Sequence, residues 1–232
     1  MLDHRNTIAT GHILTLEDPI EFLFRNKKSI VNQREIGSDA SDLPIALKNA
    51  LRQAPDCILI GEIRDKETMA AALAYAQSGH LVVATLHANN SYQALTRIIN
   101  FYPIENRQSL LADLSSTLRA IVSQRLIGAI DGRRRAAVEV LLNTRHIAEL
   151  IEQGEIALIK EAIEKSLSPG SQTFEQALMQ LIKDGIVTQD EALAHADSAS
   201  NLFWLLNNSA QTVQEEAPEQ EEASFTEFTL KM

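Results

Sequence analysis

The first 142 residues alternate strand-like and helix-like patterns of apolar residues. This alternation is typical of a layered α/β domain with a mostly parallel sheet, because each crossover between parallel strands is long enough to hold a helix. Residues 57–60 are apolar at every position, as a strand covered on both faces should be. We expect residues 81–86 to form a second buried strand, and further strands at residues 12–16 and 134–142.

Apolar spacing and capping signals predict the helices between these strands. Asp65 is a plausible N-cap for an alanine-rich helix over residues 66–77, and Gly79 can supply the left-handed turn that ends it. We expect further helices at residues 42–54, 91–101 and 107–126.

The pattern becomes purely helical after residue 142. Two sequences there fit the capping box, in which a side chain at each end of the first turn satisfies a backbone amide: Thr173 with Gln176, and Thr188 with Glu191. Residues 209–232 are rich in Glu and Gln and cannot bury enough apolar surface to order themselves. We therefore predict an α/β core (1–142), a small helical bundle (143–208) and a disordered acidic tail (209–232).

Composition limits the class of protein. The net charge of −10 argues against a nucleic-acid motor with a basic surface, although the last 22 residues, with six Glu and one Lys, carry half of it. No apolar run approaches the roughly 20 residues that cross a bilayer, so we expect a soluble cytoplasmic chain. The single cysteine, Cys57, lies in an apolar run that predicts burial, and it excludes an internal disulfide or a multi-cysteine metal cluster.

Glu62 follows the apolar strand 57–60 and precedes a predicted helix. This order places its carboxylate at the carboxyl edge of the sheet, where open α/β folds bind ligands. A Walker-B acid belongs there, near a Mg²⁺ ion that bridges phosphates, either directly or through water. A solvated turn acid without chemistry is the alternative.

Two other strands also end in polar side chains. Glu17 and Asp18 precede Pro19, which stiffens the turn, and a carboxylate held there could orient or deprotonate a water that attacks a terminal phosphate. The alternative is an Asp-Pro turn with no chemistry. His87 ends the strand 81–86 and could hydrogen-bond a γ-phosphate, or it could be a satisfied core histidine.

The printed chain contains no phosphate loop. Such a loop needs the pattern G-x-x-x-x-G-K-[ST], because glycine amides surround the phosphates while a lysine reaches the outer ones. None of the nine glycines is followed by lysine. Together with the three polar strand ends, this pattern looks like the back half of an ATP-driven motor.

Three segments resemble motifs of the secretion and type IV pilus ATPase superfamily. Residues 17–22 resemble its Asp box, residues 58–65 its Walker B and residues 79–89 its His box, in the family's order, within a match over roughly residues 11–195. The resemblance implies a RecA-like P-loop NTPase core, ATP and Mg²⁺, and a hexameric ring. It also implies docking beneath the inner membrane on a platform protein, where hydrolysis drives pilus extension or retraction.

The resemblance also implies roles for individual residues. Glu17 would activate water, Glu62 would associate with Mg²⁺, directly or through water, and His87 would contact the γ-phosphate; Asp18 would lie with them in the nucleotide site. Either Glu17 or Glu62 could hold the water. Arg97 matches an arginine that contributes to a nucleotide site at a subunit boundary, and its alternative is an exposed helix cation.

Two departures from the family pattern matter. The phosphate loop should lie just before Met1, since residues 1–6 resemble the helix that follows it. We therefore expect a fragment or a truncated gene model, and we expect this polypeptide alone not to hydrolyse ATP. The single cysteine excludes the four-cysteine zinc module of the GspE-related assembly ATPases.

The second departure lies in residues 146–152, His-Ile-Ala-Glu-Leu-Ile-Glu. The PilT retraction motif Ala-Ile-Arg-Asn-Leu-Ile-Arg has two arginines that this segment lacks. Together with the acidic tail, this departure resembles the PilU-like branch, whose members are accessory retraction motors that depend on a PilT-like paralogue. A PilT role, a pilus-assembly or type II secretion ATPase, and a non-catalytic interaction subunit stay open as alternatives.

Overall fold

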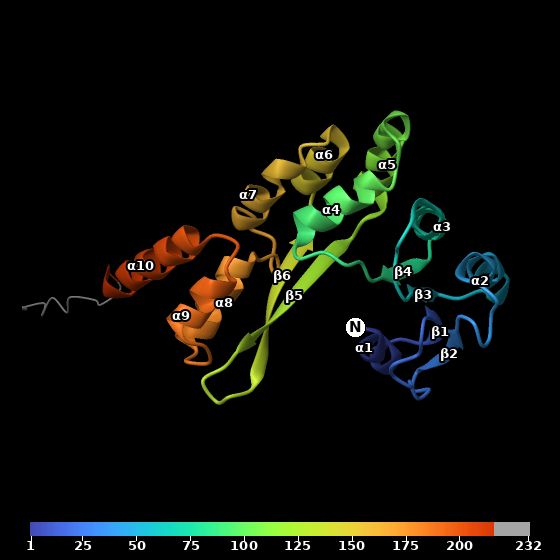
Figure 1. The fold of residues 1–232 in the computed structure, drawn as a ribbon, viewed down its shortest axis with the longest axis horizontal. Helices are drawn as coiled ribbons and strands as arrows, with labels where there is room; N and C mark the ends of the chain where they lie inside the picture. Colours follow the sequence, from blue (N-terminus) through green and yellow to red (C-terminus); the bar gives the residue numbers. More distant parts are fainter. Residues whose placement is uncertain (216–232) are drawn as a thin grey trace, which may run out of the picture. The chain divides into compact units, whose positions relative to one another are not determined.

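A computed structural model describes the backbone of residues 1–215, and the remainder of the predicted tail lies outside the described residues. The chain divides into two compact units (Figure 1). The first combines Met1–Arg125 with Val138–Thr173, and the second combines Leu126–Ala137 with the described residues from Phe174 onward. No helix of the described part is both long and apolar enough to cross a membrane.

The first unit contains a four-stranded sheet in the order β2-β1-β3-β4, and every neighbouring pair is parallel. The strands are β1 (Gly11–Glu17), β2 (Ser29–Glu35), β3 (Cys57–Ile60) and β4 (Leu81–Ala84). In the register, Leu16 lies opposite Ile60, which lies opposite Ala84. The carboxyl ends of β1, β3 and β4 therefore meet at one edge, and the predicted α/β class with a parallel sheet is confirmed.

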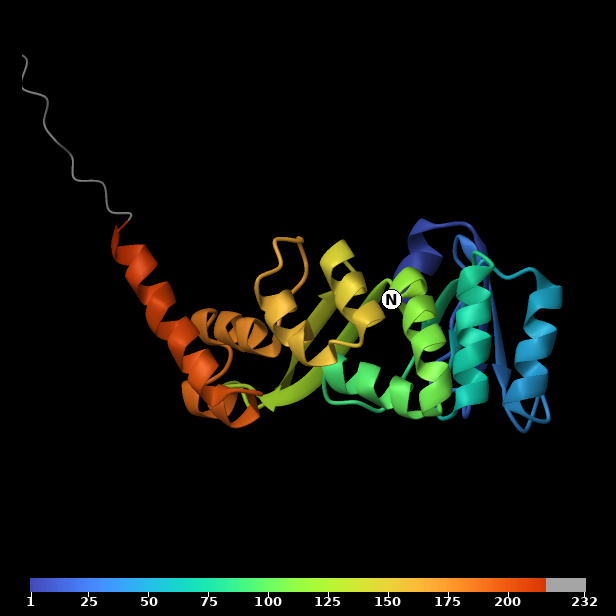
Figure 2. The same cartoon turned by 90° about the horizontal axis from the view of Figure 1, so that it is seen from above.

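Helices cover one face of this sheet. Figure 2 shows α2 (Leu43–Ala50), α3 (Lys66–Gln77) and α5 (Ile104–Thr117) side by side along it. The apolar side chains of β1 and β3 on this face enter the large core: Leu14, Leu16, Ile58 and Ile60. On the other face Cys57 is fully buried beside Ile13 and Leu2 of α1 (Leu2–Ile8), which confirms the predicted burial of the cysteine. Burial raises the pKa of the Cys57 thiol.

Two sequence predictions are wrong in part. β4 ends at Ala84 instead of residue 86, and it is less buried than expected at the end of the strand order: Leu81 and Ala84 are exposed, and Val82 and Val83 are half-buried. The helix expected over residues 107–126 runs from Ile104 to Thr117, and Ala120–Gly128 forms β5, which pairs with β6 (Arg134–Leu142) in a two-stranded sheet. Along β5, exposed and more buried residues alternate, as in a strand. The apolar residues of this segment also fit a helical spacing, so the sequence alone favoured a helix.

Before residue 142 the first unit also holds α4 (Ser91–Asn100) and a short 3-10 segment, Leu51–Gln53. After residue 142 its elements are α6 (Arg145–Gln153), the 3-10 segment Ile156–Leu158 and α7 (Ile159–Glu164), which confirms the predicted helical pattern. The second unit holds α8 (Phe174–Lys183), α9 (Gln189–His195) and α10 (Ala199–Glu215), packed around Ile127 and Ala137 of the hairpin. Thr188 accepts a hydrogen bond from the Glu191 backbone at the start of α9, as the capping pattern predicts. The only tryptophan, Trp204, is exposed on α10.

Candidate functional site

The three polar segments lie at the carboxyl edge of the parallel sheet. Glu17 is the last residue of β1, Glu62 comes two residues after β3, and His87 comes three residues after β4. Gly61 lets the ends of β1 and β3 approach: its amide donates to the Leu16 carbonyl over 2.8 Å. A Cβ at Gly61 would lie 3.0 Å from that carbonyl oxygen and 3.3 Å from the Glu17 Cα, so any larger side chain would press on the backbone of β1.

Neighbouring side chains from all three segments contact one another in a row. Arg64 donates a hydrogen bond to Glu62 Oε1, and its Nη1 lies 3.9 Å from Asp18 Oδ2. His87 Nε2 lies 3.3 Å from the other Glu62 oxygen, Oε2. The structure therefore brings Asp18, Arg64, Glu62 and His87 together in that order, and we call this set the edge cluster.

The edge cluster favours an ionised Glu62. The hydrogen bond from Arg64 lowers the pKa of the Glu62 carboxyl below its usual range; partial burial opposes this effect, and the charges of Arg64, His87 and Arg97 add to it. The Glu62 side chain is 22% exposed, whereas the side chains of Arg64 and His87 are 61% and 79% exposed. Glu62 is therefore a partly buried anion between a solvent-facing arginine and a solvent-facing histidine, and His87 is not a buried core histidine.

This arrangement predicts a pH-dependent contribution of Arg64 to stability. Because the folded pKa of Glu62 lies below the unfolded value of about 4.3, the contribution is fully present above that value and is lost as the pH falls through the folded pKa. Urea unfolding of Arg64→Leu should therefore show a lower midpoint than wild type at pH 7, and the difference between the two midpoints should be smaller at pH 3.

The matched control is Arg52→Leu, which removes an exposed arginine for which the described residues show no ion pair. Its midpoint should differ from wild type by a similar small amount at both pH values. Equal losses at pH 7 and pH 3 for Arg64→Leu would show that the lost stability does not come from Glu62.

Glu17 lies in a different local environment from Glu62. Its Oε1 accepts hydrogen bonds from Thr15 Oγ1 at 2.6 Å and from Gln33 Nε2 at 3.0 Å. Thr15 lies two residues before Glu17 on the same face of β1, and Gln33 is the residue of β2 that pairs with Thr15. These contacts fix the Glu17 carboxylate on the face of the sheet that carries Thr15.

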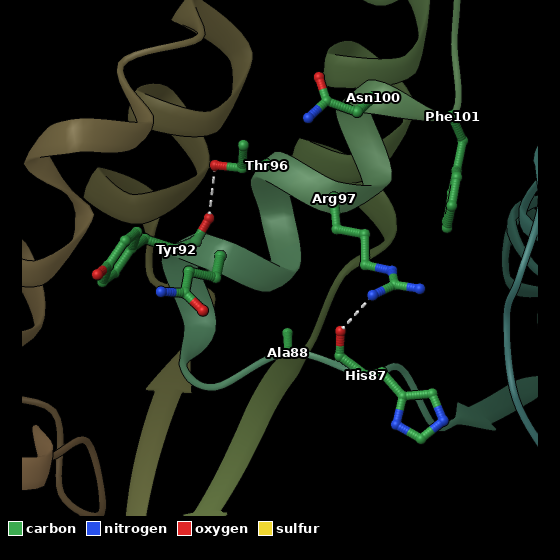
Figure 3. A pocket seen from close by; sticks show the side chains of 8 residues that line it. His87, Ala88, Tyr92, Thr96, Arg97, Asn100 and Phe101 are labelled. Atoms are coloured by element: carbon green, nitrogen blue, oxygen red, sulfur yellow. Dashed lines mark hydrogen bonds between the residues drawn. The ribbon is translucent and has the colours of Figure 1, made fainter. Parts of the chain in front are cut away.

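Arg97 projects from α4 toward the segment that carries His87. Its Nη1 donates to the His87 carbonyl over 2.9 Å, while the residue itself is exposed on the helix (Figure 3). Beside this contact lies a pocket of about 630 Å³, open to solvent and lined by residues that include His87, Gln93, Arg97 and Phe101. The pocket offers a guanidinium and an imidazole to an anionic ligand.

Sequence reasoning missed three residues of this region: Arg64, Thr15 and Gln33. Arg64 stands two positions after Glu62, and a cation so close to the expected acid was a usable signal. Thr15 stands two positions before Glu17 in the predicted strand 12–16, so strand alternation was a usable signal for it as well. Gln33 could not be found, because β2 is mostly polar and was not predicted as a strand.

Comparison with curated proteins gives two relatives from Pseudomonas aeruginosa. The type IV pilus ATPase PilU is 52% identical over 207 residues, which cover 89% of this chain and 54% of that protein. The type IV pilus retraction ATPase PilT is 40% identical over 201 residues, which cover 87% of this chain and 58% of that protein. The chain thus spans somewhat more than half the length of these relatives.

A solved structure and a family model agree with these relatives. A crystal structure of the pilus retraction motor PilT with bound ADP superposes with a TM-score of 0.80 at 38% identity, covering 87% of this chain and 57% of that one. The model of the type II/IV secretion system protein family matches residues 3–140, which is more than half of the chain. With its parallel sheet and its motifs in the family's order, the chain belongs to the type II/IV secretion system protein family, the family of the GspE and PilT ATPases.

Proposed function

We propose that this chain is part of a PilU-like motor ATPase that couples ATP hydrolysis to type IV pilus retraction and twitching motility. The observation that carries the proposal is the edge cluster, which gathers an ionised carboxylate, an arginine and a histidine at the ligand-binding edge of a parallel sheet. The higher identity to PilU, 52% against 40% to PilT, favours the PilU branch. The PilT structure contains bound ADP, which supports a nucleotide as ligand.

The residues present fit a Mg²⁺ ion that takes most of its ligands from water and from the phosphates of the nucleotide. Mg²⁺ commonly takes one or two carboxylates and completes its shell with waters and phosphate oxygens. Within the described residues no group of three or more His, Cys, Asp and Glu side chains is placed to hold a metal. Glu62, ionised and partly exposed, would hold the ion directly or through water, and the ion would neutralise charge that develops on the phosphates.

The other site residues would act on the nucleotide and on water. Glu17 would orient the attacking water and accept its proton at Oε2, because the hydrogen bonds described for its carboxylate both end on Oε1. His87 would donate a hydrogen bond to the γ-phosphate from its exposed imidazole, and Asp18 would keep Arg64 aligned with Glu62. Arg97 would contribute to the site at a boundary between subunits.

The proposed assembly is a homo-hexamer in the cytoplasm, working at the inner-membrane pilus machine. Its partners would be a PilT-like paralogue and the membrane platform protein, with no role for nucleic acid. The openness of the pocket beside His87 supports a site that a second subunit completes, and the net charge of −10 agrees with the absence of a nucleic-acid partner.

The proposal is tested with the complete product of the reading frame that contains this chain, beside the 232-residue chain alone. We expect the complete protein to release phosphate from MgATP and the 232-residue chain to show no hydrolysis above background, because the printed sequence has no glycine-lysine step for a phosphate loop. A complete protein that neither binds nor hydrolyses ATP would indicate a non-catalytic subunit.

A cell-based measurement separates the motor classes. Deletion of the gene should impair twitching while pili are still assembled, and the wild-type gene should restore movement. Loss of surface pili on deletion would instead indicate an assembly ATPase. Retraction that persists when only the PilT-like paralogue is deleted and this gene is intact would argue for a PilT role.

A further inference from the structure

The start of α4 is held by a buried carboxylate from another part of the first unit. The backbone amide of Ser91, the first residue of α4, donates to Glu139 Oε1 over 2.7 Å. Glu139 lies on β6 and is only 1% exposed. The first amides of a helix have no partner within the helix, and a negative charge beside them is favoured by the helix dipole, so this contact stabilises α4 at its first turn.

The segment between His87 and α4 has further supports. Arg125, on β5, donates from Nη2 to the Asn89 carbonyl over 3.2 Å, and Arg97 donates to the His87 carbonyl. Figure 3 shows the chain passing from His87 through Ala88 into α4, the helix that carries Arg97. Two contacts from the β5–β6 pair therefore hold this backbone together with contacts from α4. In α4, Arg97 donates to the His87 carbonyl, and the Gln93 amide donates to Asn90, the N-cap of the helix.

Packing alone does not require a charge at position 139. The neighbouring inward positions of β6, Ala137 and Leu141, are fully buried and apolar. A carboxylate in such surroundings loses its hydration and must recover that cost through hydrogen bonds of good geometry. The bond to Ser91 supplies such compensation, and it is directed at the helix that carries Arg97.

We infer that Glu139 is a positioning residue of the proposed nucleotide site. Its buried carboxylate sets where α4 begins and thereby the places of His87 and Arg97, although it touches neither of them. This inference rests on the proposed function only in naming the site as a nucleotide site. The placement of the segment can be measured without nucleotide.

The chain provides a matched control in its second unit. Glu175 is also fully buried, and its Oε1 accepts from the backbone amide of Ser198, just before α10, over 2.8 Å. The two glutamates thus make the same kind of contact at the start of a helix. Only the helix held by Glu139 carries a residue of the proposed site.

The first measurement is amide hydrogen exchange on the complete protein and on its variants Glu139→Ala, Glu139→Gln and Glu175→Ala. Loss of the acceptor in Glu139→Ala should speed exchange over residues 87–93 by about tenfold or more, while peptides from β1 and β3 keep wild-type rates. Glu139→Gln keeps an accepting oxygen and should restore most of the protection. Glu175→Ala should speed exchange only at the start of α10.

The second measurement is titration of the same proteins with a fluorescent ATP analogue and Mg²⁺. Glu139→Ala should weaken binding about tenfold, Glu139→Gln about threefold or less, and Glu175→Ala should bind as wild type does. Equal loss of protection in β1, β3 and α4, or equal weakening by Glu175→Ala, would overturn the inference and leave Glu139 a general stability residue.

A wild-type protein that does not bind the nucleotide would overturn the proposed function, and with it the role of Glu139 at a nucleotide site. The exchange pattern would still decide whether Glu139 fixes the His87 segment. The two failures can therefore be told apart.

Discussion

Glu62→Gln is expected to reduce ATP hydrolysis by the complete protein by about 100- to 1000-fold while nucleotide affinity stays within a few-fold of wild type. Glutamine has the size of glutamate and can still accept a hydrogen bond from Arg64. It carries no charge, however, and so cannot balance the metal ion or the charge that develops in phosphoryl transfer. The loss should therefore appear in kcat, with little change in the binding of MgATP.

Glu67→Gln is the matched control, because Glu67 is an exposed glutamate in the first turn of α3, only five residues further along the chain. It should hydrolyse ATP at the wild-type rate. Phosphate release under single-turnover and steady-state conditions measures both variants. Wild-type hydrolysis by Glu62→Gln would contradict the Walker-B assignment, and the same test on Glu17→Gln would then show whether that acid carries the chemistry.

Gly61→Ala is expected to destabilise the protein by about 1–3 kcal/mol, because the added methyl group presses on atoms that cannot move aside. The nearest atoms are the Leu16 carbonyl oxygen and the Glu17 Cα, both backbone atoms held by strand pairing: Leu16 pairs with Ile60 of β3, and Glu17 pairs with Glu35 of β2. The usual gain from replacing glycine, a less flexible unfolded chain, offsets only part of this cost. The midpoint of urea unfolding measures the change.

The control for Gly61→Ala is Gly128→Ala. A Cβ at Gly128 would also approach an atom at 3.0 Å, but that atom is Glu191 Oε1, the end of a flexible side chain that can shift. Its effect should be much smaller. If Gly61→Ala unfolds at the same urea concentration as Gly128→Ala, the close approach of the two strand ends is not tight in solution.

The strands of the fold could be predicted from the sequence where burial alone determines the pattern. β3 has the predicted bounds because the apolar run of residues 57–60 is covered on both faces. β2 could not be predicted, because Ser29–Glu35 is mostly polar and is a strand only through its pairing with β1. The true end of α5 was missed, because residues 117–122 fit a helical spacing locally and only the pairing of β5 with β6 makes them part of a strand.

In the candidate site, too, the sequence predicts what is local and misses contacts between residues that are distant along the chain. The places of Glu17, Glu62 and His87 at strand ends follow from the alternation of strands and helices, which is local information. The contacts between Glu62, Arg64 and Asp18 depend on side-chain conformations and on the approach of two strand ends that are distant in sequence. The dependence of α4 on Glu139 spans 48 positions along the chain, and no local pattern reports it.

The distribution of aromatic residues makes the two units optically separable. Trp204, the only tryptophan, belongs to the second unit, while all three tyrosines, Tyr75, Tyr92 and Tyr102, belong to the first. Fluorescence excited near 295 nm therefore comes from the second unit alone, whereas all of the tyrosine signal comes from the first unit. A single protein without any label can thus show in one melting experiment whether the unit with the candidate site loses its structure before, with or after the other.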